Sequence, residues 1–170
     1  MASLDLSRLS RQDAVVALRS YPRRFRTVLL PTDDPDVEEL AYQVGPDGHS
    51  ALDHVVTTTN TFVLLGRAID VALSAPDPVV HAAVIDASQR DWASPSHLSI
   101  GDALDRLESE AGALADRVER GEPPTWNREV SVAGGQGKIT AFGIVKEAVA
   151  AGSEHLRAST TAVAAARRRM

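Results

Sequence analysis

Two histidines, His54 and His155, have the best placement for chemistry in this sequence. Each falls on a helical stripe of mostly small residues, which leaves room for an imidazole to project into a cavity between helices. His54 lies in a first helical turn, where the helix dipole favours the neutral, metal-binding form of the ring. Spacing alone favours a simpler interpretation, in which each ring is half-buried and hydrogen-bonded to a carbonyl or a water molecule. The stripes comprise Thr58, Thr61, Leu65, Ala68 and Ala72 after His54, and Ile144, Ala148, Ala151, Ala158 and Ala162 around His155.

Three helix-start signals help to place the elements that carry these residues. A serine followed three residues later by an aspartate occurs at Ser10, Ser50 and Ser99. In each case the hydroxyl can accept an orphan backbone N–H, and the carboxylate complements the positive end of the dipole. After Ser99 the apolar residues recur at alternating intervals of four and three, which predicts a helix over 99–121. That stripe comprises Ile100, Leu104, Leu107, Ala111, Leu114 and Val118.

The same apolar periodicity predicts three further helices. One begins after Ser10, and Pro22 should kink or split it. A second runs from about 50 to 75, where two prolines end it, and the last runs from about 139 to the C-terminus. Strand-like alternation occurs only over 128–132, which we interpret as too short and isolated to make a sheet.

The connections between these helices are long. The segments Pro31–Gly48 and Pro76–Pro95 exceed what an up-down bundle with short loops would need. A four-helix bundle with crossover connections does need them, and such bundles place ligand sites between facing helices. The sequence therefore predicts an all-α fold, a four-helix bundle with long crossover connections, in a single domain over residues 1–170.

Composition excludes several classes of function. The absence of cysteine excludes disulfides, thiolate metal sites and a catalytic thiol of the chain's own. A net charge of -5 argues against nucleic-acid binding, despite the basic cluster Arg23, Arg24 and Arg26. No apolar run spans a membrane, and the N-terminus does not look like a signal peptide, so we expect a cytoplasmic protein.

The remaining histidines and the tryptophans have no ligand spacing. His49, His81 and His97 fall in loops or at their edges, and we interpret them as surface residues. Trp92 and Trp126 are expected to cover the bundle from its loops, because a large aromatic side chain in a small domain usually serves packing.

Four stretches of the chain resemble one known family. The stretch Ala51-Leu52-Asp53-His54-Val55 is similar to the first metal-ligand helix of the DinB/YfiT-like family. The stretch Trp126-Asn127-Arg128-Glu129, a glycine-containing loop and the final helix around 147–157 resemble the family's C-terminal half. The resemblance covers nearly the whole chain. The family consists of four-helix bundles and includes bacillithiol- and mycothiol-dependent S-transferases and the N-terminal domain of mycothiol-dependent maleylpyruvate isomerase.

The resemblance implies a metal site between the second and the last helix. The family's usual ligands are three histidines, of which His54 matches the first and His155 the last. Ala151 stands where the middle histidine belongs, and Glu154 occupies a neighbouring position that is often another histidine. Glu147, one turn before Ala151, would be an additional oxygen donor. If the resemblance holds, the rings of His54 and His155 should converge and bind a divalent metal such as zinc or nickel.

Two functions follow from these observations, and the sequence leaves the choice between them open. The first is a metal-assisted transferase or isomerase that depends on a low-molecular-weight thiol such as mycothiol, with catalytic residues unknown. The second is a non-catalytic ligand-binding or structural protein of the same fold, in which the metal site has decayed. Either function is compatible with a small-molecule thiol or substrate as partner and with a homodimer packed through its helices.

Overall fold

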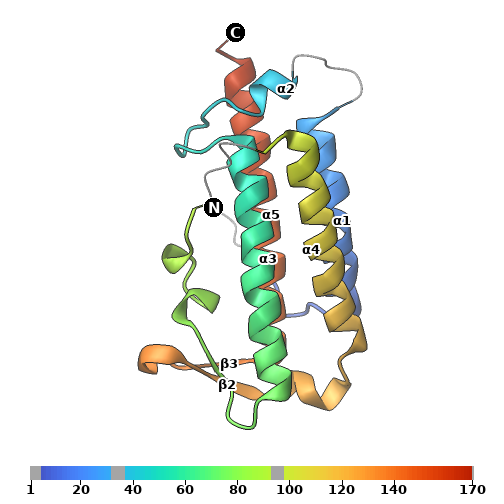
Figure 1. Cartoon of the computed structure of the whole chain (residues 1–170), viewed down its shortest axis with the longest axis vertical. Helices are drawn as coiled ribbons and strands as arrows, with labels where there is room; N and C mark the ends of the chain where they lie inside the picture. The colour runs from blue at the N-terminus through green and yellow to red at the C-terminus, as the bar shows by residue number, and fades with distance from the viewer. Residues whose placement is uncertain (1–4, 32–36, 93–97, 170) are drawn as a thin grey trace.

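A computed structural model of the chain describes residues 5–31, 37–92 and 98–169. Four long helices run side by side and form the body of the molecule (Figure 1). The elements in chain order are α1 (Arg11–Leu29), α2 (Val37–Leu40), α3 (Ala51–Ser74), β1 (Val79–Val80), η1 (Ala82–Val84), η2 (Ala87–Gln89), α4 (Ile100–Arg120), η3 (Pro123–Asn127), β2 (Glu129–Val132), η4 (Ala133–Gly135), β3 (Lys138–Thr140) and α5 (Ala141–Arg167). The predicted all-α bundle is confirmed.

Each of the three predicted serine caps begins a long helix. The side chains of Ser10, Ser50 and Ser99 accept the backbone N–H of the aspartate three residues later. At Ser10 and Ser50 the aspartate also accepts the cap residue's own N–H, which completes a capping box. Pro22 does not split the helix that contains it. Helix α1 continues through Pro22 over Arg11–Leu29, and the Pro22 side chain is buried.

The core lies between two diagonal helix pairs. Both α1 and α3 pack against α4 and α5, whereas α1 and α3 touch each other only slightly. The predicted stripe of α4 faces this core, and Leu104, Leu107 and Leu114 are completely buried in it. Within the described residues, no helix is both long and apolar enough to cross a membrane.

A small sheet closes one end of the bundle, contrary to the prediction for 128–132. Strand β2 pairs in parallel with β1 and antiparallel with β3, with Val79 opposite Ser131 and Glu129 opposite Thr140. The interpretation of this stretch as isolated was wrong because one partner strand comes from a distant crossover. Val130 and Val132 are buried beneath the bundle end, which explains the alternation.

The two long connections are the structural features that shape one side of the bundle. The first contains α2 and a turn whose Gly45 approaches α5 so closely that a Cβ would lie 2.7 Å from the Cβ of Ala162. The second leaves the end of α3 and returns along the outside of that helix (Figure 1). Both connections therefore approach the same end of the α3–α5 pair.

Candidate functional site

The structure brings His54 and His155 together. Helices α3 and α5 are packed and run in opposite directions (Figure 1), so the first turn of α3 lies beside the second half of α5. The Nδ1 atoms of the two imidazoles are 3.2 Å apart, although 101 positions separate the residues in the chain. The convergence that the resemblance implied is present.

Burial keeps both rings neutral at pH 7. The His54 side chain is only 2% exposed, and burial lowers its pKa below the ordinary value of 6.5. Burial likewise lowers the pKa of His155 to about 4, with the charges of His54 and Arg90 adding to the effect. Neutral imidazoles have the lone pairs that metal ligation requires.

A carboxylate approaches His54 from the opposite side of its ring. Asp47 lies in the turn before α3, where its Oδ1 accepts the N–H of His49, and its Oδ2 is 3.1 Å from His54 Nε2. That contact has the distance of an ion pair but does not meet the angles of a hydrogen bond, so the buried Nε2 has no hydrogen-bond partner among the described residues. Asp47 is partly exposed, and a small rotation of its side chain would align the two groups.

The nearby carboxylate favours one of the two neutral tautomers of His54. An acceptor beside Nε2 favours the Nε2–H tautomer, which leaves the Nδ1 lone pair directed at His155. His155 can then donate its own Nδ1–H to that lone pair and form a hydrogen-bonded pair. Alternatively His155 carries its proton on Nε2, and the two Nδ1 lone pairs converge on a cation.

The donor set provides two nitrogen ligands. Two nitrogens 3.2 Å apart suit one ion that lies about 2.0–2.1 Å from each. Ala151 is buried one turn before His155 and supplies no donor. Among the described residues, no group of three histidines and carboxylates is arranged to hold one metal ion. The pair therefore offers a divalent metal two imidazole nitrogens, without a third protein ligand among the described residues.

Glu147 faces a different partner. Its Oε2 is 3.4 Å from Nη2 of Arg90, whose guanidinium also donates to the carbonyls of Ala83 and Val84. Arg90 thereby attaches the second crossover to α5 beside the histidine pair. The role of Glu147 as an oxygen donor remains a prediction, and a metal would have to compete with Arg90 for it.

Two residues that the sequence did not associate with the pair lie over it. The ring of His49 stacks on the indole of Trp92, with centroids 3.5 Å apart and planes 4° from parallel. Trp92 meets His54 and His155 edge-on at 5.3 and 5.5 Å. His49 is half-buried, and its place over the pair was not expected from its interpretation as a surface residue. Its position directly before Ser50 was the available signal, since a residue there must lie near the start of α3.

Trp92 covers the bundle from a loop, as predicted from the sequence, although its side chain remains partly exposed. Trp126 is buried and packs edge-on to Phe142. His81 caps η1 by accepting the N–H of Ala83, away from the pair. His97 lies outside the described residues.

Comparison with solved structures places this arrangement in a known fold. The chain is similar to YfiT from Bacillus subtilis, which is described as a probable metal-dependent hydrolase with an unusual four-helix bundle topology. The TM-score is 0.68 at 12% sequence identity, over 100% of this chain and 93% of YfiT. No protein-family model matches the sequence, and no curated protein matches it significantly. The chain thus has a DinB/YfiT-like four-helix bundle fold.

Proposed function

We propose that this chain is a metal-assisted enzyme in which His54 and His155 are the protein's two metal ligands. The observation that carries the proposal is the convergence of two neutral imidazoles on one point between α3 and α5, with Nδ1 atoms 3.2 Å apart. The description of YfiT as a probable metal-dependent hydrolase supports a metal-dependent function for a protein of this fold. Zinc and nickel are among the ions that suit imidazole ligands.

The residues around the histidine pair would orient the ligands and shield them from water, and none of them is proposed to react with the substrate. Asp47 beside Nε2 favours the His54 tautomer whose Nδ1 lone pair faces His155, and Trp92 with the stacked His49 keeps bulk water from one side of the pair. A bound divalent metal would lower the pKa of a thiol or water molecule, or polarise a carbonyl. Since the chain contains no cysteine, a thiol nucleophile would come from a small molecule such as mycothiol.

The class of reaction depends on which nucleophile the metal would activate. With water the protein would be a hydrolase, and with a low-molecular-weight thiol it would be an S-transferase or isomerase. The two are separated by incubating metal-loaded protein with an activated ester, or with an electrophile in the presence and absence of mycothiol. Ester cleavage without thiol supports the hydrolase, whereas thiol-dependent consumption of the electrophile supports the transferase.

A non-catalytic role is the second candidate function. The missing donor at Ala151 and the engagement of Glu147 by Arg90 favour it. In that case the histidines form a hydrogen-bonded pair that joins α3 to α5, and the protein serves as a ligand-binding or structural bundle.

The deciding experiment is metal analysis of protein purified without a histidine tag, followed by calorimetric titration with zinc and nickel. The proposal requires one ion per chain, and loss of binding in both His54→Ala and His155→Ala. His81→Asn is the matched control, because His81 lies outside the pair and asparagine can still cap η1. Binding that survives both alanine variants, or no binding by the wild type, leaves the non-catalytic role.

A further inference from the structure

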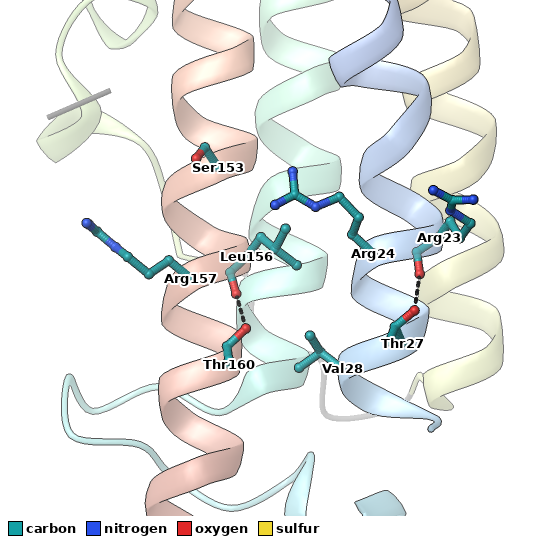
Figure 2. Close-up of a pocket in the computed structure, with 8 residues that line it drawn as sticks. All are labelled: Arg23, Arg24, Thr27, Val28, Ser153, Leu156, Arg157 and Thr160. Carbon is teal, nitrogen blue, oxygen red and sulfur yellow. Dashed lines mark hydrogen bonds between the residues drawn. The ribbon is translucent and has the colours of Figure 1, made fainter. Parts of the chain in front are cut away.

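A groove with a positive lining runs between α1 and α5, separate from the histidine pair. It has a volume of about 620 Å³, within the range of small-molecule sites. Arg23, Arg24 and Val28 line it from α1, and Ser153, Leu156 and Arg157 from α5 (Figure 2). None of its lining residues is acidic.

The side of α1 that faces α4, which Arg23 also borders, carries a basic surface that carboxylates neutralise. There Arg19 pairs with Asp116 and Glu119 of α4, and Arg26 contacts two further carboxylates of that helix. The arginines of the groove have no carboxylate within ion-pair distance among the described residues. In a chain with a net charge of -5, this leaves a local concentration of uncompensated positive charge.

Packing between the helices positions the central arginine. The Tyr21 ring lies against α5 at Gly152, where a Cβ would come within 2.5 Å of the ring's Cε2, and its hydroxyl donates to the carbonyl of Val149 at 2.7 Å. The Arg24 guanidinium lies over this fixed ring, 5.9 Å from the centroid. Tyr21 therefore gives Arg24 a defined platform at the edge of the groove.

The side chains around Arg24 differ in their directions. Figure 2 shows Arg24 extending from α1 toward the α5 side, with Ser153 above it on the opposite wall. Arg157 extends outward from α5, away from Arg24, and Arg23 leans toward α4 (Figure 2). The Ser153 hydroxyl makes no hydrogen bond to another described residue, so it is free to donate to a ligand. Val28 and Leu156 supply an apolar surface below these polar groups.

We propose that this groove binds a small organic anion that carries a phosphate group. The phosphate would contact Arg24 and Ser153, because a guanidinium matches two phosphate oxygens and a hydroxyl donates to a third. Arg157 is exposed and would rotate into the groove as a second positive partner. The apolar part of the ligand would lie on Val28 and Leu156. This site is independent of the proposed metal centre.

Calorimetric titration with phenyl phosphate tests the proposal, since this probe combines the charged and the apolar group. Arg24→Gln and Arg157→Gln remove one charge each from exposed positions. Arg67→Gln is the matched control, as Arg67 is an exposed arginine on α3 away from the groove. We expect saturable binding that each groove variant weakens about tenfold and that the control changes less than about twofold.

Two further readouts locate the ligand. In NMR spectra the methyl signals of Val28 and Leu156 should shift on titration, and inorganic phosphate should bind more weakly because it lacks the apolar part. Absence of saturable binding, or equal weakening in all three variants, would overturn the proposal. Inorganic phosphate binding as tightly as phenyl phosphate would overturn the assignment of an organic anion.

Discussion

The imidazole of His49 and the indole of Trp92 stack face to face, with ring centroids 3.5 Å apart. His49 ends the first long crossover and Trp92 lies on the second, so this contact is where the two connections meet. It lies directly over the facing rings of His54 and His155. The long connections of the bundle thus cover the candidate site as well as join helices.

Replacing the missing ligand should create a three-histidine centre. A histidine at position 151 would project from the same face of α5 as His155, one turn away, which is the i, i+4 spacing that lets two rings bind one ion. Ala151→His should bind zinc and nickel more tightly than the wild type. At a metal concentration about 100 times Kd, melting experiments should show about 2.7 kcal/mol of added stability.

The control for this substitution is His54→Ala in the same background, which should remove the gain. Without metal, and in the presence of a chelator, Ala151→His should be neutral or mildly destabilising, because position 151 is buried. Unchanged metal affinity would mean that the pair does not bind an ion between α3 and α5.

The variant Asp47→Asn tests whether Asp47 orients the His54 ring for metal binding or only contributes to folding stability. The carboxylate raises the pKa of His54, so its loss should lower that pKa further in an NMR titration. Loss of a partner that orients a ligand typically weakens metal binding about 10- to 100-fold, which calorimetry would detect. The metal-free protein should keep its stability within about 0.5 kcal/mol, since Asp47 is partly exposed. Metal affinity equal to that of the wild type would remove Asp47 from the site.

Stability of the metal-free protein should decrease in mildly acidic solution because of His155. Its pKa is about 4 when folded and near 6.5 when unfolded, so the unfolded state takes up the proton first as the pH falls. His155 therefore does not lower the free energy of unfolding above about pH 6.5. Between about pH 6.5 and pH 4 that free energy should fall progressively, by up to about 3 kcal/mol. Urea unfolding of His155→Gln should show a flatter dependence on pH over this interval, and identical pH profiles would contradict a partly buried, neutral His155 ring.

The seam of α4 should be essential for folding stability. Leu107 and Leu114 are both completely buried, so alanine at either position would leave a cavity. Each substitution should lower the free energy of unfolding by about 2–5 kcal/mol, measured with urea. Leu64→Ala is a comparison on α3, where the leucine is only partly buried, and should cost less. A cost near zero for both α4 variants would contradict the packing of this helix.

Alanine substitution of two helical glycines should have opposite effects on stability, because only Gly152 lies in the contact between α1 and α5. In Gly152→Ala the new methyl would overlap the Tyr21 ring, and the forced shift should cost about 1–3 kcal/mol. Gly112→Ala on α4 meets nothing within 4 Å and should stabilise the helix by up to about 1 kcal/mol. Thermal denaturation of the two variants provides the test, and stabilisation by Gly152→Ala would contradict the close approach of the helices.

Local sequence determined the helices of this protein and where they begin. The hydroxyl of Ser50 and the carboxylate of Asp53 act within one turn, so their pattern specifies a helix start before any tertiary contact forms. The stripe that contains Leu107 and Leu114 likewise required burial whatever its partner. These interactions span three or four residues, and a sequence pattern displays them directly.

Tertiary structure decided everything that joins distant segments. The valines of 129–132 alternate in the sequence, but their partner strand β1 comes from a crossover about fifty residues earlier, and only folding brings the two edges together. His54 and His155 were recognisable as candidates, yet the 3.2 Å between them depends on the packing of α3 against α5. The stacking of His49 on Trp92 has no local signal at all, because it forms between two irregular connections whose paths are set by the helices they cover.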